Sequence, residues 1–366
     1  MEPGTLAAVS FAAAQGGFAI RTVRDAEARA TGVATASRVT SWFAPPSDAA
    51  GAGLATLRTG DDGACVFFER DAGRLCAVQR QLGHAALPSA CRHFPRVALL
   101  DARGTFVKLS HFCPTAARLL FRDDVPVSVV TNAPAFPAGG EYEGLDARRV
   151  LPPLLRPGVL HTLESYTAWE AFAVRAFTRG DAPPDALLAL VAGAAEEVRA
   201  WAPALGPVEH HVRRVAARWL AREGPPAGPA CAAVDATALV DDVRGAVPSH
   251  LAIPSPVDAV AEGWDDWVAD AWPTFAQPVG RFLATHAFAN WVAYQGAGLR
   301  TAVRAIAAAL TLLEVECVRT CRADRGPLTS PRLVEAIRAT DSWLLHLASP
   351  DTLTRRLSHH EPRPLA

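Results

Sequence analysis

Residues 299–326, LRTAVRAIAAALTLLEVECVRTCRADRG, decide the fold class of this chain. Apolar side chains recur in this stretch every three or four residues, which is the spacing of an amphipathic helix. The longest uncharged apolar run, AIAAALTLL at 305–313, is too short to cross a bilayer. The stretch therefore predicts a long helix that packs within a globular helical domain.

Similar patterns lie on both sides of this stretch. Helical spacing predicts further helices at 162–180, 184–202, 206–224, 258–272, 279–296 and 330–348. Residues 223–256 are broken by proline and glycine and are expected to form loops. No repeat of fixed period indicates a solenoid. We therefore expect a large all-α body.

The first part of the chain has a different pattern. Between residues 64 and 113, short β-compatible pieces alternate with glycine and proline, and RVALLDARGTFVKLS at 96–110 predicts a hairpin that turns at DARG. Pro114 opens a short helix, and APAFPAGGEYEG at 133–144 predicts a linker. The predicted fold is mainly α, and its parts are a small cysteine-rich α+β module at 1–130, a linker at 131–150 and a helical body at 151–366.

The composition excludes several classes of protein. Of the 366 residues, 50% are hydrophobic and 20% are charged, so a globular protein is expected rather than a disordered one. The 36 basic and 37 acidic residues nearly cancel, and no basic field indicates nucleic acid or an anionic membrane as a partner. Lys108 is the only lysine and Met1 the only methionine, which indicates a coding bias and weakens any argument from arginine.

The start of the chain bears on the compartment. MEPGTLAAVSFAAAQGG, residues 1–17, lacks the basic region and the long apolar run of a signal peptide. We therefore expect a cytoplasmic protein. A reducing compartment disfavours disulfides, so clustered cysteines there are expected to bind metal or to react.

Four of the seven cysteines lie within 49 residues, and they are Cys65, Cys76, Cys91 and Cys113. Four thiolates suit Zn²⁺ in a tetrahedral cage or an iron–sulfur cluster, because both take soft sulfur ligands. The 10, 14 and 21 residues between successive members cannot fix such a geometry locally, so the fold would have to do it. The alternative is that these cysteines are small buried hydrophobic residues, as free cysteines often are.

Positive charge accompanies two of these cysteines, since their neighbours include Arg92, His93, Arg96 and His111. Basic side chains would offset the negative charge of a four-thiolate site and favour the thiolate form. We expect Arg92 and Arg96 to provide this compensation. Phe94 and Pro95 are expected to fix the turn that presents Cys91.

A longer segment carries a family resemblance. GACVFFERDAGRLCAVQRQLGHAALPSACRHFPR at 63–96, followed by LSHFCP at 109–114, resembles the second half of the CxxCxxxxCC cysteine-cluster family. That family is described as zinc- or iron-chelating, and flagellin lysine-N-methylases are related to it. Its pattern is C-x-F/Y-L, G-x-C-x-I, a proline, C-R-x-F-P and a further cysteine. These places are taken in order by Cys65, Cys76, Pro88, Cys91 and Cys113, over about 50 residues.

The resemblance implies a zinc ion or an iron–sulfur cluster held by these four cysteines. Beyond that, it implies a protein-lysine N-methyltransferase that acts on a protein substrate. The chain departs from the family because residues 1–64 contain no cysteine, so the CxxCxxxxCC half is missing. Neither GAGLATL at 51–57 nor GAGLR at 296–300 has the strand–turn–helix context of an S-adenosylmethionine site. No motif thus supports that cofactor, and no catalytic residue is indicated.

Other residues favour structural roles. Cys317 and Cys321 share one face of the predicted helix, and core packing is favoured there over a metal site or a redox pair. His286 and His346, single histidines in apolar helices, are expected to be satisfied core residues. The histidines of EHHVRR at 209–214 are expected on the surface. Core packing is also expected of Trp264, Trp267, Trp272 and Trp291.

Three functional hypotheses follow. The first is a metal- or iron–sulfur-binding protein of the cysteine-cluster family. The second is a non-catalytic protein in which a structural zinc, or thiol packing alone, holds the small module together while the helical body binds a partner protein. The third is a thiol redox sensor, in which mild oxidant joins two of the four cysteines reversibly.

Overall fold

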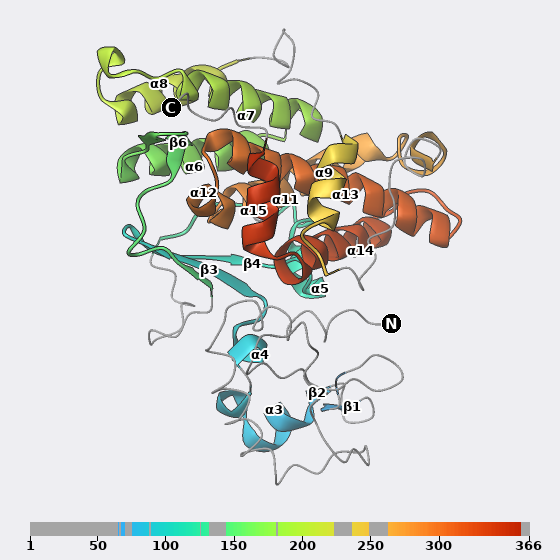
Figure 1. Cartoon of the computed structure of the whole chain (residues 1–366). Helices are drawn as coiled ribbons and strands as arrows, with labels where there is room; N and C mark the ends of the chain where they lie inside the picture. The colour runs from blue at the N-terminus through green and yellow to red at the C-terminus, as the bar shows by residue number, and fades with distance from the viewer. Residues whose placement is uncertain are drawn as a thin grey trace.

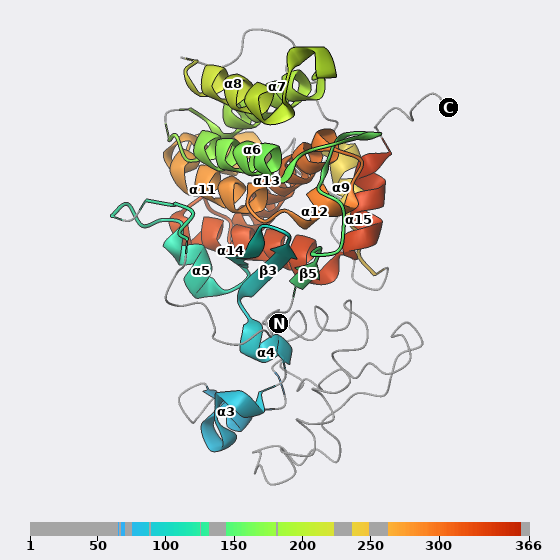
Figure 2. The same ribbon diagram turned by 90° about the vertical axis from the view of Figure 1, so that its left-hand side faces the viewer.

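The computed structural model describes residues 65, 67–69, 75–87, 89–124, 126–131, 144–180, 182–222, 236–248 and 263–359. Of these residues 62% are helical and 10% lie in strands, so the protein is mainly α with a small α+β module, as predicted. The helical body and the small module are shown in Figures 1 and 2. The region of the missing upstream cysteine motif, Cys231 and residues 132–143 of the predicted linker lie outside the described residues.

Helix α13 (Leu299–Ala323) runs through the helical body (Figure 1). Its neighbours are α7 (Pro184–Arg199), α9 (Ala236–Arg244), α11 (Ala276–Ala287) and α14 (Ser330–Asp341). Because helices surround it, α13 buries side chains such as Ile306, Leu312 and Leu313. The stretch that predicts the long helix therefore forms it. Among the described helices, none is both long enough and apolar enough to span a membrane.

Helices α6 (Leu163–Phe177), α7 and α8 (Val208–Leu220) form one layer of the body (Figure 2). Helix α6 packs against α8 and α11. The Thr162 side chain caps α6 by accepting a hydrogen bond from the Ser165 N–H. Gly193 of α7 allows Trp219 to pack closely, because a Cβ at this position would lie 2.4 Å from the indole ring.

Two helices differ from the sequence prediction. Helix α9 lies in the region expected to form loops, because Leu239, Val240 and Val243 give it an apolar face, and it packs against α13. The helix predicted at 279–296 is interrupted. Helix α11 ends at Ala287, and α12 (Trp291–Gln295) begins a few residues later.

The break between α11 and α12 is stabilised by two side chains. Ala289 has a φ of 48°, and its N–H donates to Glu170 Oε1 of α6 at 2.9 Å. Asn290 caps α12, since its Oδ1 accepts the Val292 N–H at 2.9 Å. An interrupted helix leaves some backbone N–H groups without a partner, and these two bonds satisfy the N–H groups of Ala289 and Val292.

Helix α14 continues directly into a π-helical turn, η4 (Ser342–Leu347), and α15 (Pro350–Ser358) follows. The side chain of Ser349 caps α15 by accepting the Thr352 N–H. A π-helical turn changes the direction in which successive side chains point, and such turns are frequent at functional sites.

A three-stranded sheet packs against the body (Figure 1). Strands β3 (Arg96–Asp101) and β4 (Gly104–Leu109) form the predicted hairpin, and β5 (Gly144–Asp146), within the segment predicted as a linker, pairs parallel to β3. A Cβ at Gly144 would lie 2.0 Å from the Ala98 carbonyl oxygen, so only glycine fits there. Helix α5 (Pro114–Leu119) follows the hairpin, has proline in its first turn as predicted, and packs against α14.

The small module contains β1 (Phe68–Glu69), β2 (Leu75–Cys76), α3 (Ala77–Leu82), η1 (His84–Ala86) and α4 (Ser89–His93). Strands β1 and β2 pair antiparallel, with Phe68 opposite Cys76. The remaining short elements of the body are β6 (Leu154–Arg156), β7 (Val159–Leu160), η2 (Pro203–Leu205) and η3 (Trp272–Phe275). The predicted domain boundaries at 130 and 150 stay predictions.

Candidate functional site

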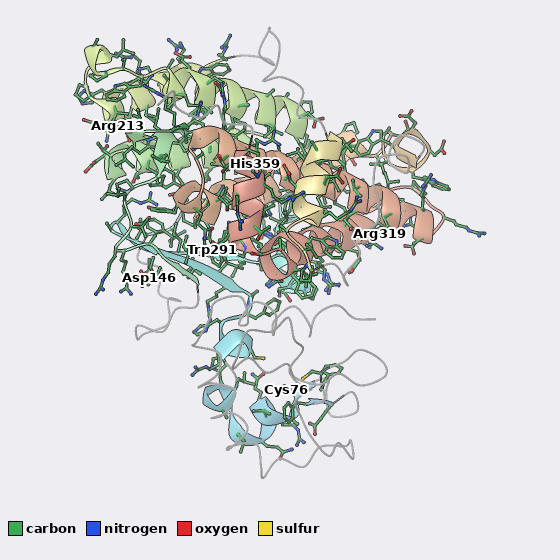
Figure 3. All side chains as sticks on the ribbon, viewed as in Figure 1. Cys76, Asp146, Arg213, Trp291, Arg319 and His359 are labelled. Atoms are coloured by element: carbon green, nitrogen blue, oxygen red, sulfur yellow. The ribbon has the colours of Figure 1, made fainter. Side chains whose placement is uncertain are left out.

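Three of the four predicted metal ligands belong to the small module. Cys65 precedes β1, Cys76 lies at the junction of β2 and α3, and Cys91 lies on α4. All three are partly buried against one apolar cluster, whose buried members are Phe67, Ala77, Val78, Ala86 and Leu87. Figure 3 labels Cys76 within this module. The fold therefore brings three distant cysteines to one cluster, which we call the cysteine cluster.

The fourth predicted ligand, Cys113, is not a member of the cysteine cluster among the described residues. It stands at the start of α5, where its carbonyl accepts the Ala117 N–H at 3.0 Å and its N–H donates to the Ser110 carbonyl at 3.3 Å. In the part of the chain that the structure describes, no three Cys, His, Asp or Glu side chains form a group that could hold a metal ion. The four-cysteine site therefore stays a prediction.

Burial sets the chemistry of the Cys65 thiol. Burial raises the pKa of Cys65 to about 11. A backbone hydrogen bond from Phe67 lowers the pKa, and the neighbouring Cys76 thiol raises it further. Cys65 is therefore a neutral thiol at neutral pH, and a thiol in that form is a poor nucleophile. A metal would have to displace this proton before the sulfur could bind it.

The predicted turn residues, Phe94 and Pro95, connect the small module to the helical body. Phe94 packs against Phe112 and His346, with ring centroids 6.1 Å away in both cases. The Pro95 carbonyl accepts the Ser110 N–H at 2.7 Å. Because Cys91 lies on the helix just before these residues, they fix where α4 sits on the body. The guanidinium of Arg96, expected to offset thiolate charge, donates to the Arg92 carbonyl at 3.5 Å.

A buried polar network lies next to this aromatic contact. Asp341, at the end of α14, is fully buried and accepts the His111 backbone N–H at 2.5 Å. Its carboxylate also lies 3.1 Å from His111 Nδ1 and 2.9 Å from His286 Nε2. These donors hold the pKa of Asp341 well below its usual range, in spite of burial. Ser110 Oγ lies 2.7 Å from His346 Nε2.

The structure confirms some of the predictions for the histidines and contradicts others. His286 and His346 each have a hydrogen-bond partner for Nε2 in the interior, in line with the predicted core role. His111 was expected to offset thiolate charge, but Asp341 is its partner. In α8, His210 is exposed as expected. His211 is buried, contrary to the surface prediction, because its ring faces the Glu197 carbonyl at 3.1 Å.

Cys317 and Cys321 lie on α13 and are completely buried in the main core, so the predicted packing role is confirmed. Trp272 is likewise buried in the core, and Trp264 packs against it with ring centroids 5.2 Å apart. Trp291 is partly buried and packs against a small core cluster, as predicted, and its side chain also lines a cavity.

Asp341 was not singled out from the sequence. The available signal is an aspartate inside ATDSWLLHLA, residues 339–348, a mostly apolar part of a predicted helix. A buried carboxylate needs partners, and the pattern does not say which residues supply them. His111 lies 230 residues away along the chain.

Comparison with protein-family models, with curated proteins and with solved structures finds no match for this chain. The assignment of the cysteines therefore depends on their spacing, on the resemblance of residues 63–96 and 109–114 to the cysteine-cluster family, and on their position in the fold.

Proposed function

We propose that this chain is a metal-binding protein whose small module takes zinc or the iron of an iron–sulfur cluster through Cys65, Cys76 and Cys91. Cys113 is the candidate for the fourth ligand. Thiolate sulfur is the ligand that both metals share. The proposal takes up the family resemblance, and it is supported by the position of three of the thiols on one cluster.

The observation that carries the proposal is a difference between two groups of cysteines. Cys317 and Cys321 have no exposed surface and pack in the main core, which is the usual behaviour of a free cysteine that acts as a hydrophobic residue. The four N-terminal cysteines are free thiols as well, but each of them is only partly buried. Incomplete burial favours a role in binding over a role in packing.

The small size of the module also favours a bound metal. Among the residues that the structure describes, the cysteine cluster contains five buried hydrophobic side chains. A core of this size contributes little stability by itself, and small domains of this kind commonly depend on a bound metal or on disulfides. A structural metal ion often organises its own site, because ligand positions become fixed only when the metal binds. Convergence of the thiols on binding is therefore part of the proposal.

The test is metal analysis of the full chain, purified anaerobically, with zinc, iron and acid-labile sulfide measured per chain. We expect either stoichiometric zinc in a colourless protein or iron with sulfide and broad visible absorption. Cys65→Ser, Cys76→Ser and Cys91→Ser should each lose most of the metal. The matched control, Cys317→Ser, removes a buried thiol and should keep it.

Two outcomes would contradict the proposal. One is wild-type protein with no stoichiometric metal, and the other is equal metal content in all the serine variants. Cys113→Ser decides separately whether Cys113 is a ligand. The cytoplasmic location is part of the proposal, since a reducing compartment keeps such thiols available. Protein-lysine methylation stays a prediction from the resemblance.

A further inference from the structure

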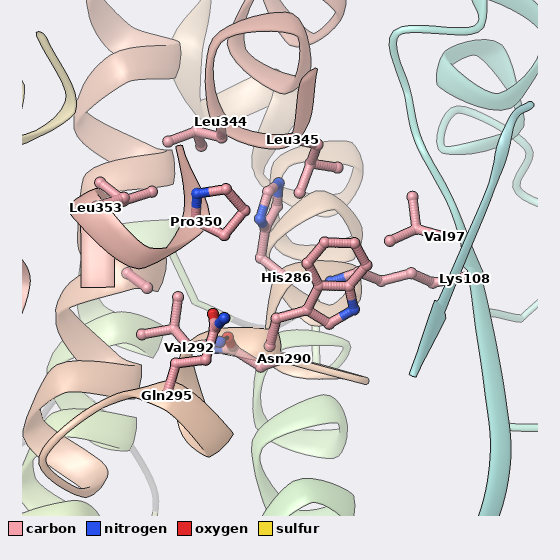
Figure 4. Close-up of a pocket in the computed structure, with 12 residues that line it drawn as sticks. Val97, Lys108, His286, Asn290, Val292, Gln295, Leu344, Leu345, Pro350 and Leu353 are labelled. Atoms are coloured by element: carbon pink, nitrogen blue, oxygen red, sulfur yellow. Dashed lines mark hydrogen bonds between the residues drawn. The ribbon is translucent and has the colours of Figure 1, made fainter. Parts of the chain in front are cut away.

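A small cavity lies between the β3–β4 hairpin and the helical body (Figure 4). Its volume is about 60 Å³, and its walls come from β3, β4, the α11–α12 connection, α13, η4 and α15. Most of its lining is apolar, including Val97, Leu345 and Leu353. The polar side chains at its surface are those of Lys108, His286, Asn290, Trp291 and Gln295.

Lys108 is the only lysine of the chain, and it lies on β4 opposite Val97. Its Nζ donates to the Thr285 carbonyl at 3.1 Å, the one hydrogen bond described for this ammonium group. Burial lowers the pKa of Lys108 to about 8, although the charges of Asp341 and Glu170 act in the opposite direction. An appreciable fraction of this amine is therefore unprotonated near neutral pH, which is a condition for nucleophilic attack.

His286 lines the same cavity, and a contact with Asp341 orients its ring. The Asp341 Oδ1 lies 2.9 Å from His286 Nε2. If Nε2 carries the proton that faces the carboxylate, Nδ1 carries a lone pair. In the described residues no hydrogen bond to Nδ1 is present. This is the arrangement in which a carboxylate orients a histidine so that its second nitrogen can exchange protons.

We propose that this cavity is a covalent binding site for a small aldehyde or ketone, which Lys108 captures as an imine. The Nζ lone pair forms a C–N bond to the carbonyl carbon, and the carbonyl oxygen takes up a proton. The resulting carbinolamine loses that oxygen as water and leaves a protonated imine. Overall, an ammonium group and a carbonyl compound give an iminium ion and water, so no oxidant or reductant is needed. His286 exchanges the protons in both directions.

The chemistry of the walls favours a neutral carbonyl compound over an anion. Asp341 is ionised directly behind His286, and Glu170 also acts on Lys108, so a bound anion would face negative charge. The apolar side chains suit a short hydrocarbon portion. A cavity of this volume admits about four to six non-hydrogen atoms, on the scale at which one water needs roughly 10–15 Å³.

The sole lysine makes the test specific. The full chain is incubated with propanal and sodium cyanoborohydride, which reduces an imine to a stable propylamine, and the product is located by peptide mass mapping. We expect Lys108 to be modified at least tenfold faster in the native protein than in the same protein unfolded in urea. The N-terminal amine serves as an internal reference in both states.

A buried lysine with a merely structural role would react more slowly in the native protein than in the unfolded one, and that result would overturn the inference. Lys108→Arg keeps the positive charge and should abolish side-chain labelling. His286→Asn should slow labelling of Lys108 about tenfold while His210→Asn, on the surface, leaves it unchanged. Equal labelling in the native and His286→Asn proteins would remove His286 from the proposal. None of these readouts depends on metal in the cysteine module.

Discussion

At the scale of single residues, Asp341 joins segments that are far apart in the chain. Its carboxylate contacts His111, which follows β4, and His286 on α11. Because Asp341 is fully buried, its charge depends on these donors for stabilisation. The residue therefore fixes the sheet, α11 and α14 relative to one another, and it also orients the histidine of the cavity.

We expect Asp341→Asn to lower the free energy of unfolding by about 3 kcal/mol, because the amide accepts fewer hydrogen bonds and places a donor against two histidines. Urea unfolding followed by circular dichroism measures this change. The control is Asp124→Asn, since Asp124 is exposed and forms an ion pair with Arg122 on the surface; no measurable change is expected. A similar small effect for Asp341→Asn would show that the network contributes little.

Lys108 should titrate at a lower pH than an ordinary lysine. The rate at which the native protein forms the reduced propanal adduct should rise as pH increases through about 8 and then level off. An exposed lysine would continue to gain reactivity to a pH of about 10.4. Among the described residues, the titratable groups that act electrostatically on Lys108 are Asp341, Glu170 and His286. A rate that still rises steeply above pH 9 would contradict the lowered pKa.

At the scale of elements, local patterns predicted the elements whose stability is local. The hairpin at 96–110 and the helix within 299–326 could be predicted because their own apolar spacing and turn residues mark them. The break between α11 and α12 was not predictable in this way. It depends on a hydrogen bond from Ala289 to Glu170, which is 119 residues away. Asn290 and Trp291 reach the cavity because of that break.

The backbone conformation at the break between α11 and α12 gives a prediction about the stability of two glycine variants. Ala289 has a positive φ, which costs an alanine about 1 kcal/mol and a glycine almost nothing. Ala289→Gly removes this strain but also removes a completely buried methyl group, so the free energy of unfolding should change by less than about 1 kcal/mol. The same change two residues earlier, Ala287→Gly, falls within α11 and should lower it by about 1 kcal/mol. The thermal unfolding temperature should therefore fall clearly in Ala287→Gly and much less in Ala289→Gly, and equal shifts would contradict the assigned backbone conformation.

At the scale of the whole molecule, one candidate site could be predicted from the sequence and the other could not. The cysteine module was visible as a pattern, because its members lie within 49 residues. The cavity was not, since it combines Val97 and Lys108 of the hairpin with His286 and Leu353 of the body. Lys108 was conspicuous in the sequence only as the single lysine. Long-range packing, which no local pattern encodes, gave it a partner and a lowered pKa.

The interior as a whole also holds histidines that burial keeps neutral. Burial lowers the pKa of His161 to about 3 and that of His346 to about 4. Both values lie below the unfolded value of about 6.5. Above pH 6.5 neither state binds the proton, so stability does not change there. Below it, the unfolded chain binds protons that the folded chain excludes, so stability falls as the pH decreases toward the folded pKa values.

We therefore expect the free energy of unfolding to fall by about 2 kcal/mol for each of these two histidines between pH 7 and pH 5. His161→Leu removes one titrating group. Its neighbour Ser165 can keep the hydrogen bond that it donates to the Thr162 carbonyl at 3.0 Å. Urea unfolding of both proteins at a series of pH values should show a loss that is smaller by about 2 kcal/mol in the variant. Parallel pH profiles would mean that His161 takes up its proton in the folded protein, and the burial assigned to its ring would then be wrong.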